Sequence, residues 1–290
     1  MLLRIKNNAK YIFTCFTVIS SIVFGLLSIL QMFVNWDIFG VENDDTKCKI
    51  TIFCIILVGC MVLALIQFIF FSNSKSIFLK DEVEIIVKYG DLLKIAFPKK
   101  SKGDKIVVIA VNRCFDTVIN QDIIKVDSVH GQFLKLFVAD DLARQRLDNA
   151  IEASLQEFGT PYETLNRSDK RYGKLKRYPL GSVARIDGEN GITFFLLALT
   201  KFDLDCVAHC NKHEYVECLL RFFEYYDAHG QGRDIYLYPM GTKMARTGLS
   251  KKEALETTVT LTKISKEHLR AKTTIIVDRR NKNEISIMDL

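Results

Sequence analysis

Residues 234–255, DIYLYPMGTKMARTGLSKKEAL, contain a strand, a turn with two glycines and the start of a helix in immediate succession. The segment begins with DIYLY, an apolar and aromatic run typical of a buried strand. Gly241 and Gly248 then permit tight turns and a close approach of the backbone. Ser250 and Glu253 have the spacing of a capping box, which opens a helix. This order of elements predicts one unit of an α/β domain.

Four further segments have the composition of buried strands. They are short, rich in β-branched residues and apolar on both faces, which is typical of strands inside a sheet that helices cover on both sides. They are VEIIV (83–87), KIVVIAV (105–111), ITFFLLAL (192–199) and TTIIV (273–277).

Three helices are predicted among these strands. The first runs from Asp140 to Phe158 and ends at a glycine. The second runs from Asn211 to His229, where Asn211 and Glu214 form a second capping box, and the third runs from Ser250 to about His268. The polar stretch between the first two helices, residues 160–181, is expected to be a surface excursion. From about residue 81 the chain therefore predicts a single α/β domain.

Two uncharged segments precede this domain, at residues 11–34 and 50–71. At 1.5 Å per residue each is about 33–36 Å long as a helix, enough to cross a hydrocarbon core of roughly 30 Å. A cleaved signal peptide is the competing interpretation of the first segment, but its apolar stretch is too long and no small-residue cleavage site follows. The predicted organisation is a cytoplasmic N-terminal tail (1–10), transmembrane helix 1 (11–34), a short external loop (35–49), transmembrane helix 2 (50–71), a linker (72–80) and the α/β domain (81–290).

Charge around the two segments predicts their orientation. Arg4, Lys6 and Lys10 precede the first segment, and Lys75 and Lys80 follow the second, whereas the loop between the segments is acidic. The Lys/Arg bias therefore places both chain ends and the α/β domain on the cytoplasmic side. Small residues four apart occur in both segments and can let membrane helices approach closely, although incidental small residues in a plain anchor explain them equally well.

Composition excludes several other functions. The net charge of +6 is modest for 290 residues, and no basic run interleaved with aromatic residues supports nucleic-acid binding. The eight cysteines lack the spacing of a disulfide framework, so free thiols in a reducing compartment are expected. Cys206, His209, Cys210 and His213 are crowded into eight residues, unlike the two separated pairs of a typical zinc site. We therefore expect no metal and no cofactor.

Ligands of open α/β sheets bind beyond the carboxyl ends of the strands, where turn amides and helix N-termini point at the gap. Asp91 follows the first strand of the domain, where its carboxylate can accept a hydrogen bond from an amine or a sugar hydroxyl. An aspartate that only ends the turn after Gly90 is an equally good interpretation. After the second strand, VNRCFDT supplies Asn112, Arg113 and Asp116.

Two more stretches have the position of ligand loops. DSVHGQF places Ser128, His130 and Gly131 ahead of a helical segment, and His130 either pairs with a ligand phosphate or is a structural histidine. The turn of the opening segment is a candidate anion loop, although the chain contains no G-x-x-x-x-G-K-[ST] P-loop. The side chains in it that can donate hydrogen bonds to an anion are Thr242, Lys243, Arg246 and Thr247.

The succession VEIIVKYGDLL, KIVVIAVN and DIYLYPMGT before a capped helix resembles the macro domain, a three-layer α/β/α fold that binds ADP-ribose. The resemblance covers residues 81–290. More narrowly, VNRCFDT, DSVHGQF and GTKMARTGLSKKEAL behind two membrane segments are similar to the membrane-bound macro-domain effectors of Thoeris antiphage defence systems. The fold class we expect is therefore two N-terminal transmembrane helices followed by a three-layer macro-like domain.

The resemblance implies roles for individual residues. Asp91 matches the aspartate that contacts the adenine amine, with the Leu92 amide beside it, and Asn112 matches the first asparagine of the family's N-A-A-N motif. The turn after residue 238 matches the second phosphate loop, near the diphosphate or the distal ribose. The expected ligand-binding set is Asp91, Leu92, Asn112, Arg113, Asp116, Ser128, His130, Gly131, Gln132, Gly241, Thr242, Lys243, Met244, Ala245 and Arg246.

Two departures from the family pattern bear on catalysis. Phe115 replaces the second asparagine of N-A-A-N, which faces the distal ribose in hydrolytic macro domains. Only Gly131 remains of the family's glycine-rich first phosphate loop, so this loop must have a different shape. Both departures favour binding over ADP-ribosyl hydrolysis, and we expect no catalytic residue.

The resemblance also implies a function in antiviral defence. In such systems a TIR-domain partner makes an ADP-ribose-derived signal, understood to be a histidine conjugate, and the macro domain receives it. We expect signal binding to promote self-association in the bacterial inner membrane, because two spans per chain are too few to enclose a pore. Membrane disruption would then cause abortive infection. A membrane-tethered ADP-ribosyl hydrolase and a simple ADP-ribose reader remain the alternatives.

Overall fold

The computed structural model describes residues 2–34, 45–81, 83–100, 103–120, 123–242 and 245–290. The chain divides into two compact units. One contains Met1–Lys75 together with Asn281–Leu290, and the other contains Ser76–Arg280. Most of the expected external loop, residues 35–44, lies outside the described residues.

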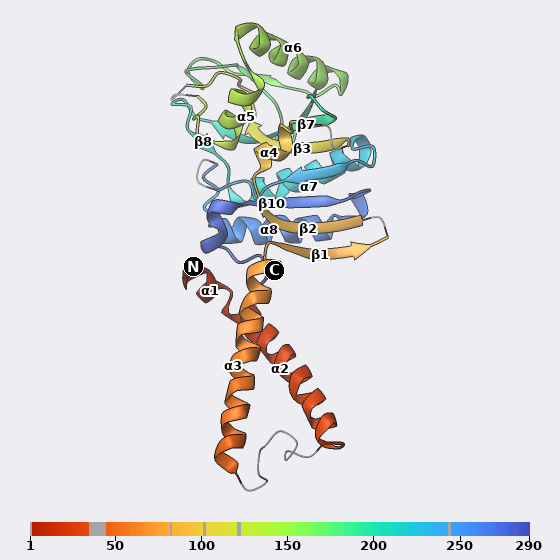
Figure 1. Ribbon diagram of the computed structural model, residues 1–290. Coiled ribbons are helices and arrows are strands. Elements are labelled where there is room, and N and C mark those ends of the chain that lie inside the picture. Colours follow the sequence, from red (N-terminus) through yellow and green to blue (C-terminus); the bar gives the residue numbers. More distant parts are fainter. Residues whose placement is uncertain (1, 35–44, 82, 101–102, 121–122, 243–244) are drawn as a thin grey trace. The chain divides into compact units, whose positions relative to one another are not determined.

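Three helices make up most of the first unit: α1 (Leu2–Asn7), α2 (Ala9–Gln31) and α3 (Thr46–Phe71) (Figure 1). Both α2 and α3 are long and apolar enough to cross a membrane. Only 11% and 17% of their most apolar windows are buried, whereas the core helix of a soluble protein would be mostly buried. The two predicted apolar helices are therefore present.

The last ten residues of the chain pack with these helices. The Ser286 hydroxyl donates a hydrogen bond to Oδ1 of the buried Asn8, at 2.6 Å. Lys75 Nζ donates to the Met288 carbonyl, also at 2.6 Å. Ile287 is fully buried. Residues 281–290 thus join the ends of the two long helices into one unit.

The second unit is built on a mixed sheet in the order β1-β2-β10-β9-β3-β7-β6, with β8 paired to β7. Five neighbouring strands are parallel, and each corresponds to one of the five strands predicted from sequence. Those predictions are confirmed. The parallel strands are β2 (Val83–Gly90), β10 (Thr273–Asp278), β9 (Asp234–Leu237), β3 (Lys105–Asn112) and β7 (Ile192–Phe202).

The strands that sequence reasoning missed are short or lie at the edge of the sheet. The stretch expected to be a linker contains β1, whose residues are all exposed or half-buried, so it lacks a continuous apolar run. The antiparallel strand β6 alternates buried and exposed residues near its end. The missed strands are β1 (Ser74–Lys80), β4 (Glu163–Thr164), β5 (Lys176–Arg177), β6 (Val183–Asp187) and β8 (Ala208–His209).

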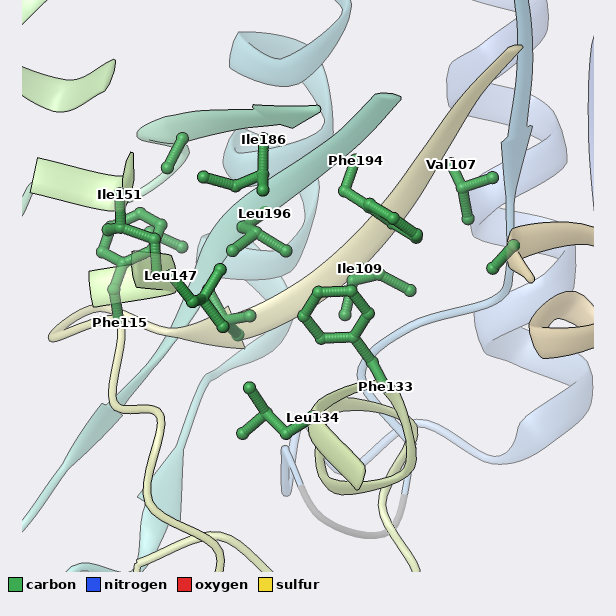
Figure 2. Packing of buried hydrophobic residues seen from close by; sticks show 14 of the residues in the cluster. Val107, Ile109, Phe115, Phe133, Leu134, Leu147, Ile151, Ile186, Phe194 and Leu196 are labelled. Carbon is green, nitrogen blue, oxygen red and sulfur yellow. The ribbon is translucent and has the colours of Figure 1, made fainter. Parts of the chain in front are cut away.

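Helices cover both faces of the sheet, as neighbouring residues of β7 show. Phe194 packs against Phe133 of α5, with ring centroids 4.9 Å apart (Figure 2). The next residue, Phe195, points to the opposite face and contacts Tyr225 of α7 at 5.4 Å. The helices on the Phe194 side are α4 (Leu92–Ala96), α5 (Val129–Phe137) and α6 (Asp141–Glu157), and those on the other side are α7 (Lys212–His229) and α8 (Lys251–Ile264).

The three predicted helices are present as α6, α7 and α8. Both predicted capping boxes form, because Asn211 accepts from the Glu214 amide and Ser250 accepts from the Glu253 amide. The third helix ends earlier than expected, and a short 3-10 turn at Lys266–His268 follows it. A second 3-10 helix, η3 (Arg279–Asn283), follows β10.

The stretch at residues 160–181 is more than the surface excursion expected from its polarity. Lys170 is fully buried, and its ammonium lies 2.6 Å from Asp116 Oδ2 just beyond β3. The backbone amide of Lys174 donates to the other Asp116 oxygen, also at 2.6 Å. A Cβ at Gly173 would lie 2.3 Å from Asp116 Oδ1, so this close approach requires glycine. A buried ion pair therefore fixes the stretch against the end of β3.

Leu196→Ala should lower the free energy of unfolding by about 2–5 kcal/mol. Leu196 is a residue of β7 whose side chain is buried in the core against the covering helices, so its truncation leaves a cavity. Leu142→Ala is the matched control, since Leu142 is 55% exposed and should change stability by no more than about 0.5 kcal/mol. Urea unfolding of the full chain in detergent measures both. Equal losses would contradict the packing described.

Lys170→Met should destabilise the chain by about 3–5 kcal/mol, because it leaves the Asp116 carboxylate buried without its cation. Lys176→Met removes a lysine from an ion pair with Glu152 at the surface and should change the unfolding midpoint little. If the two variants unfold at the same denaturant concentration, the Lys170 pair does not fix this segment.

Candidate functional site

The parallel sheet brings three of the predicted loops to one edge. Asp91 follows β2, Asn112 ends β3, and the Gly241 turn follows β9, and these strands belong to one parallel array with β10 between β2 and β9. Because the carboxyl ends of parallel strands meet at the same edge, the residues that follow them lie along one edge of the sheet, where such folds usually bind ligands.

The structure confirms a local structural role for Asp91, and its contact with a ligand stays a prediction. It is the N-cap of α4, and its Oδ1 accepts hydrogen bonds from the amides of Leu93 and Lys94, at 3.1 and 3.3 Å. The side chain is 46% exposed, and Oδ2 lies 3.9 Å from the Lys94 ammonium. One carboxylate oxygen thus holds the turn while the other faces the surface. The side chain of Leu92 is buried, so only its backbone can reach a ligand.

Asn112 carries a hydrogen-bond donor that the described protein residues leave unused. Its side chain is 3% exposed, and its Oδ1 accepts from the amide of Cys114 at 2.9 Å. The Nδ2 atom is buried and has no partner among the described residues. Because a buried donor without an acceptor costs free energy, this amide is a strong candidate to contact a ligand.

The side chains of the residues after Asn112 contact other groups of the protein. Phe115 has a φ of 50° and lies edge-on to Tyr178 with ring centroids 5.5 Å apart. The Arg113 Nε donates to the Tyr178 carbonyl at 2.8 Å, and burial followed by the nearby Arg177 lowers the pKa of Arg113. Asp116, which was expected to contact ligand, has both oxygens engaged by Lys170 and the adjoining backbone.

The stretch around His130 is a helix start where a loop was expected. Ser128 caps α5 by accepting from the Gly131 amide at 2.9 Å, so His130 and Gly131 lie in the first turn. A Cβ at Gly131 would lie 2.2 Å from the Lys125 carbonyl oxygen, which explains the glycine by packing. Gln132 donates from Nε2 to the Asp127 carbonyl at 2.9 Å. Because Ser128 caps α5, the helix begins before Gly131, which was expected to lie in a phosphate loop.

Burial lowers the pKa of His130 to about 3, with a smaller contribution from Lys174. The imidazole is therefore neutral near pH 7 and does not supply a positive charge to a phosphate. The Ser128 cap uses the Gly131 amide, so the amides of Val129 and His130 are the first-turn groups of α5 left for an anion.

The turn after β9 is held by its own buried threonine. Gly241 has a φ of 88°, and the Thr247 hydroxyl donates to its carbonyl at 2.6 Å. A Cβ at Gly241 would lie 2.9 Å from Thr247 Cγ2 and 3.2 Å from the ring of Tyr215. Thr242 is half-buried, Ala245 is buried and Arg246 is exposed. The other two predicted residues of this turn, Lys243 and Met244, lie outside the described residues.

Asp278 and Arg280 belong to this edge and were missed from sequence. In the parallel register Asp278 of β10 lies opposite Gly90 of β2, one residue before Asp91. Arg280 Nε lies 2.9 Å from Asp278 Oδ2. Asp91 was predicted because it follows a strand, and Asp278 and Arg280 follow the strand TTIIV in the same way. Their position in the sequence could therefore have identified them.

Known proteins match the chain at two levels. The family model described as "Thoeris protein ThsA, Macro domain" matches residues 85–278. A Thoeris protein ThsA from Bacillus amyloliquefaciens (strain Y2) is 26% identical over 256 residues, which covers 85% of this chain and 80% of that protein.

Solved macrodomains from Oceanobacillus iheyensis are also similar. One mutant determined with ADPR has a TM-score of 0.47 and 11% identity, covering 72% of this chain and 92% of that structure. Another mutant has a TM-score of 0.47 and 12% identity, with coverages of 75% and 91%.

The family model extends from β2 to the last residue of β10 and contains every predicted ligand-binding residue. It matches well over half of the chain. This chain therefore belongs to the family of the Thoeris protein ThsA macro domain.

Proposed function

We propose that this protein is an antiphage defence effector of the bacterial inner membrane, whose cytoplasmic macro domain binds an ADP-ribose-derived signal. The family match supports the defence system and the macro fold. A TIR-domain protein is the proposed source of the signal, and a histidine conjugate of ADP-ribose is the proposed molecule. The two apolar helices support a membrane location.

The unused amide of Asn112 is the observation that carries the ligand proposal. A buried Nδ2 without a protein acceptor is suited to a hydroxyl or ring oxygen of a ribose. On the same edge, Asp91 has an exposed carboxylate oxygen suited to an amine, and we propose that backbone amides of the Gly241 turn and of the α5 N-terminus bind phosphate. These groups together match the parts of an ADP-ribose.

Binding without turnover is the proposed chemistry. Phe115 is 1% exposed and packs on Tyr178, so this position offers an apolar ring where a hydrolase would require a polar group. Asp116 is paired with Lys170, and the pKa of His130 is lowered to about 3, so we propose that neither side chain takes part in proton transfer. A membrane-tethered hydrolase would need a positioned acid or base, a role for which neither Asp116 nor His130 is suited.

The proposed output is disruption of the membrane by assembled chains. Two apolar helices from one chain cannot enclose a pore, so several copies are required. A signal can drive such assembly only if it binds the assembled state more tightly than the separate chains. We propose that occupied macro domains supply this difference in affinity.

Asp91→Asn and Asn112→Ala should each weaken the binding of ADP-ribose to the full chain by about tenfold or more, measured by calorimetry in detergent. Asparagine is as good an N-cap as aspartate, so Asp91→Asn keeps α4 and changes only the oxygen that faces the ligand. Asp140→Asn is the matched control, because Asp140 caps α6 in the same way and is not one of the predicted ligand-binding residues.

The absence of measurable binding by the unaltered chain, to ADP-ribose and to its amino-acid conjugates, would refute the ligand proposal. Chromatography of the same mixtures tests turnover, and product formation dependent on the protein would establish the hydrolase instead.

Membrane depolarisation should occur in cells that express the full chain with an activated TIR partner, and should be lost when residues 11–71 are deleted. Gly241→Val should also abolish it, because a side chain there is strained and collides with Thr247 and Tyr215. Gly232→Val is the matched control, since Gly232 also has a positive φ but open space around it. Depolarisation that persists without the two helices would contradict the proposed membrane mechanism.

A further inference from the structure

Arg280 follows β10 at the edge of the sheet where Asp91 follows the neighbouring strand β2. The register of β2 and β10 pairs Gly90 with Asp278, so the residues that follow each strand emerge side by side. The pKa of Arg280 is raised mainly by its hydrogen bond to Asp278 and to a smaller extent by Asp91, which is consistent with this proximity. Arg280 thus belongs to the same end of the site as the carboxylate proposed to read the base.

The Asp278 carboxylate binds one edge of the Arg280 guanidinium. Its Nε donates to both oxygens of Asp278, at 3.1 and 2.9 Å, and one terminal nitrogen donates to Oδ2 at 2.5 Å. The Arg280 backbone amide donates to the same carboxylate at 2.8 Å. The side chain is nevertheless 81% exposed. The bidentate pair therefore fixes the orientation of the guanidinium while leaving most of the group open to solvent.

This arrangement is suited to a flat, uncharged ring more than to an anion. Asp278 already neutralises the guanidinium and occupies its donor edge, which weakens its attraction for phosphate. The plane of a guanidinium stacks on nucleobases, and pairing along one edge leaves that plane free. An exposed ion pair contributes little to stability, so a role in folding does not explain the arrangement well.

We propose that Arg280 is a nucleobase-stacking residue of this site, that Asp278 positions it, and that Asp91 reads the exocyclic amine in the plane of the same base. The inference rests on the proposed function, since it requires a ligand that carries a nucleobase. In this arrangement Arg280 stacks on the face of the base, while Asp91 accepts a hydrogen bond in the plane of the ring. It also assigns distinct roles to two aspartates at neighbouring strand ends.

The test is calorimetry of the full chain in detergent with two probes, ADP-ribose and its analogue with hypoxanthine in place of adenine. Arg280→Ala and Arg280→Lys should each weaken both probes roughly tenfold, because lysine keeps the charge but has no plane to stack. Asp91→Asn should weaken ADP-ribose while sparing the analogue, which lacks the amine. Arg279→Ala is the matched control, as Arg279 is the adjacent exposed arginine.

Asp278→Asn should weaken ADP-ribose less than Arg280→Ala does, and the double variant should bind no more weakly than Arg280→Ala alone. Such non-additivity separates positioning from a structural contribution, which would add to the loss. Unaltered binding by Arg280→Ala, or full retention of affinity by Arg280→Lys, would overturn the stacking role. If Asp91→Asn still weakens binding in that case, the proposed function stands; if the unaltered chain binds neither probe, the proposed function itself fails.

Discussion

Parallel pairing of strands that are apolar on both faces is the constraint on which the candidate site depends. Burial on both faces requires helices on each side, and parallel strands require those helices as crossovers. All five parallel strands then end at the same edge of the sheet. Asp91, Asn112 and the Gly241 turn meet there although up to 150 residues separate them in sequence, because the register leaves no other place for the loops.

The groups proposed to hold the ligand are those whose hydrogen-bonding capacity the fold leaves unused. Asn112 uses its oxygen to stabilise its own turn and keeps its buried Nδ2 unpaired among the described residues. Asp91 divides its oxygens in the same way between helix capping and the surface. In contrast, Asp116 is fully satisfied by Lys170 and a backbone amide. Asp116 and Asp91 are the same type of residue, and they differ in how many of their carboxylate oxygens already have hydrogen-bond partners.

The two compact units are joined by two chain connections. The chain leaves the helical unit after Lys75 and returns to it at Asn281, directly after the strand-end residues Asp278 and Arg280. The returning segment is anchored within the helical unit by the Ser286 and Asn8 side chains. The end of β10 is therefore only a few residues from the helical unit along the chain.

The sequence alone determined the central strands, the capped helices and the two apolar helices, because continuous hydrophobic runs and capping boxes are local patterns that burial enforces. It also selected Asp91, Asn112 and Gly241 as residues at strand ends. Only the tertiary structure showed that Lys170 is buried against Asp116, that α5 begins before His130, and that Asp278 lies opposite Gly90, one residue before Asp91. These facts depend on which strands are neighbours and which partners each polar atom finds, and neither is encoded in local spacing.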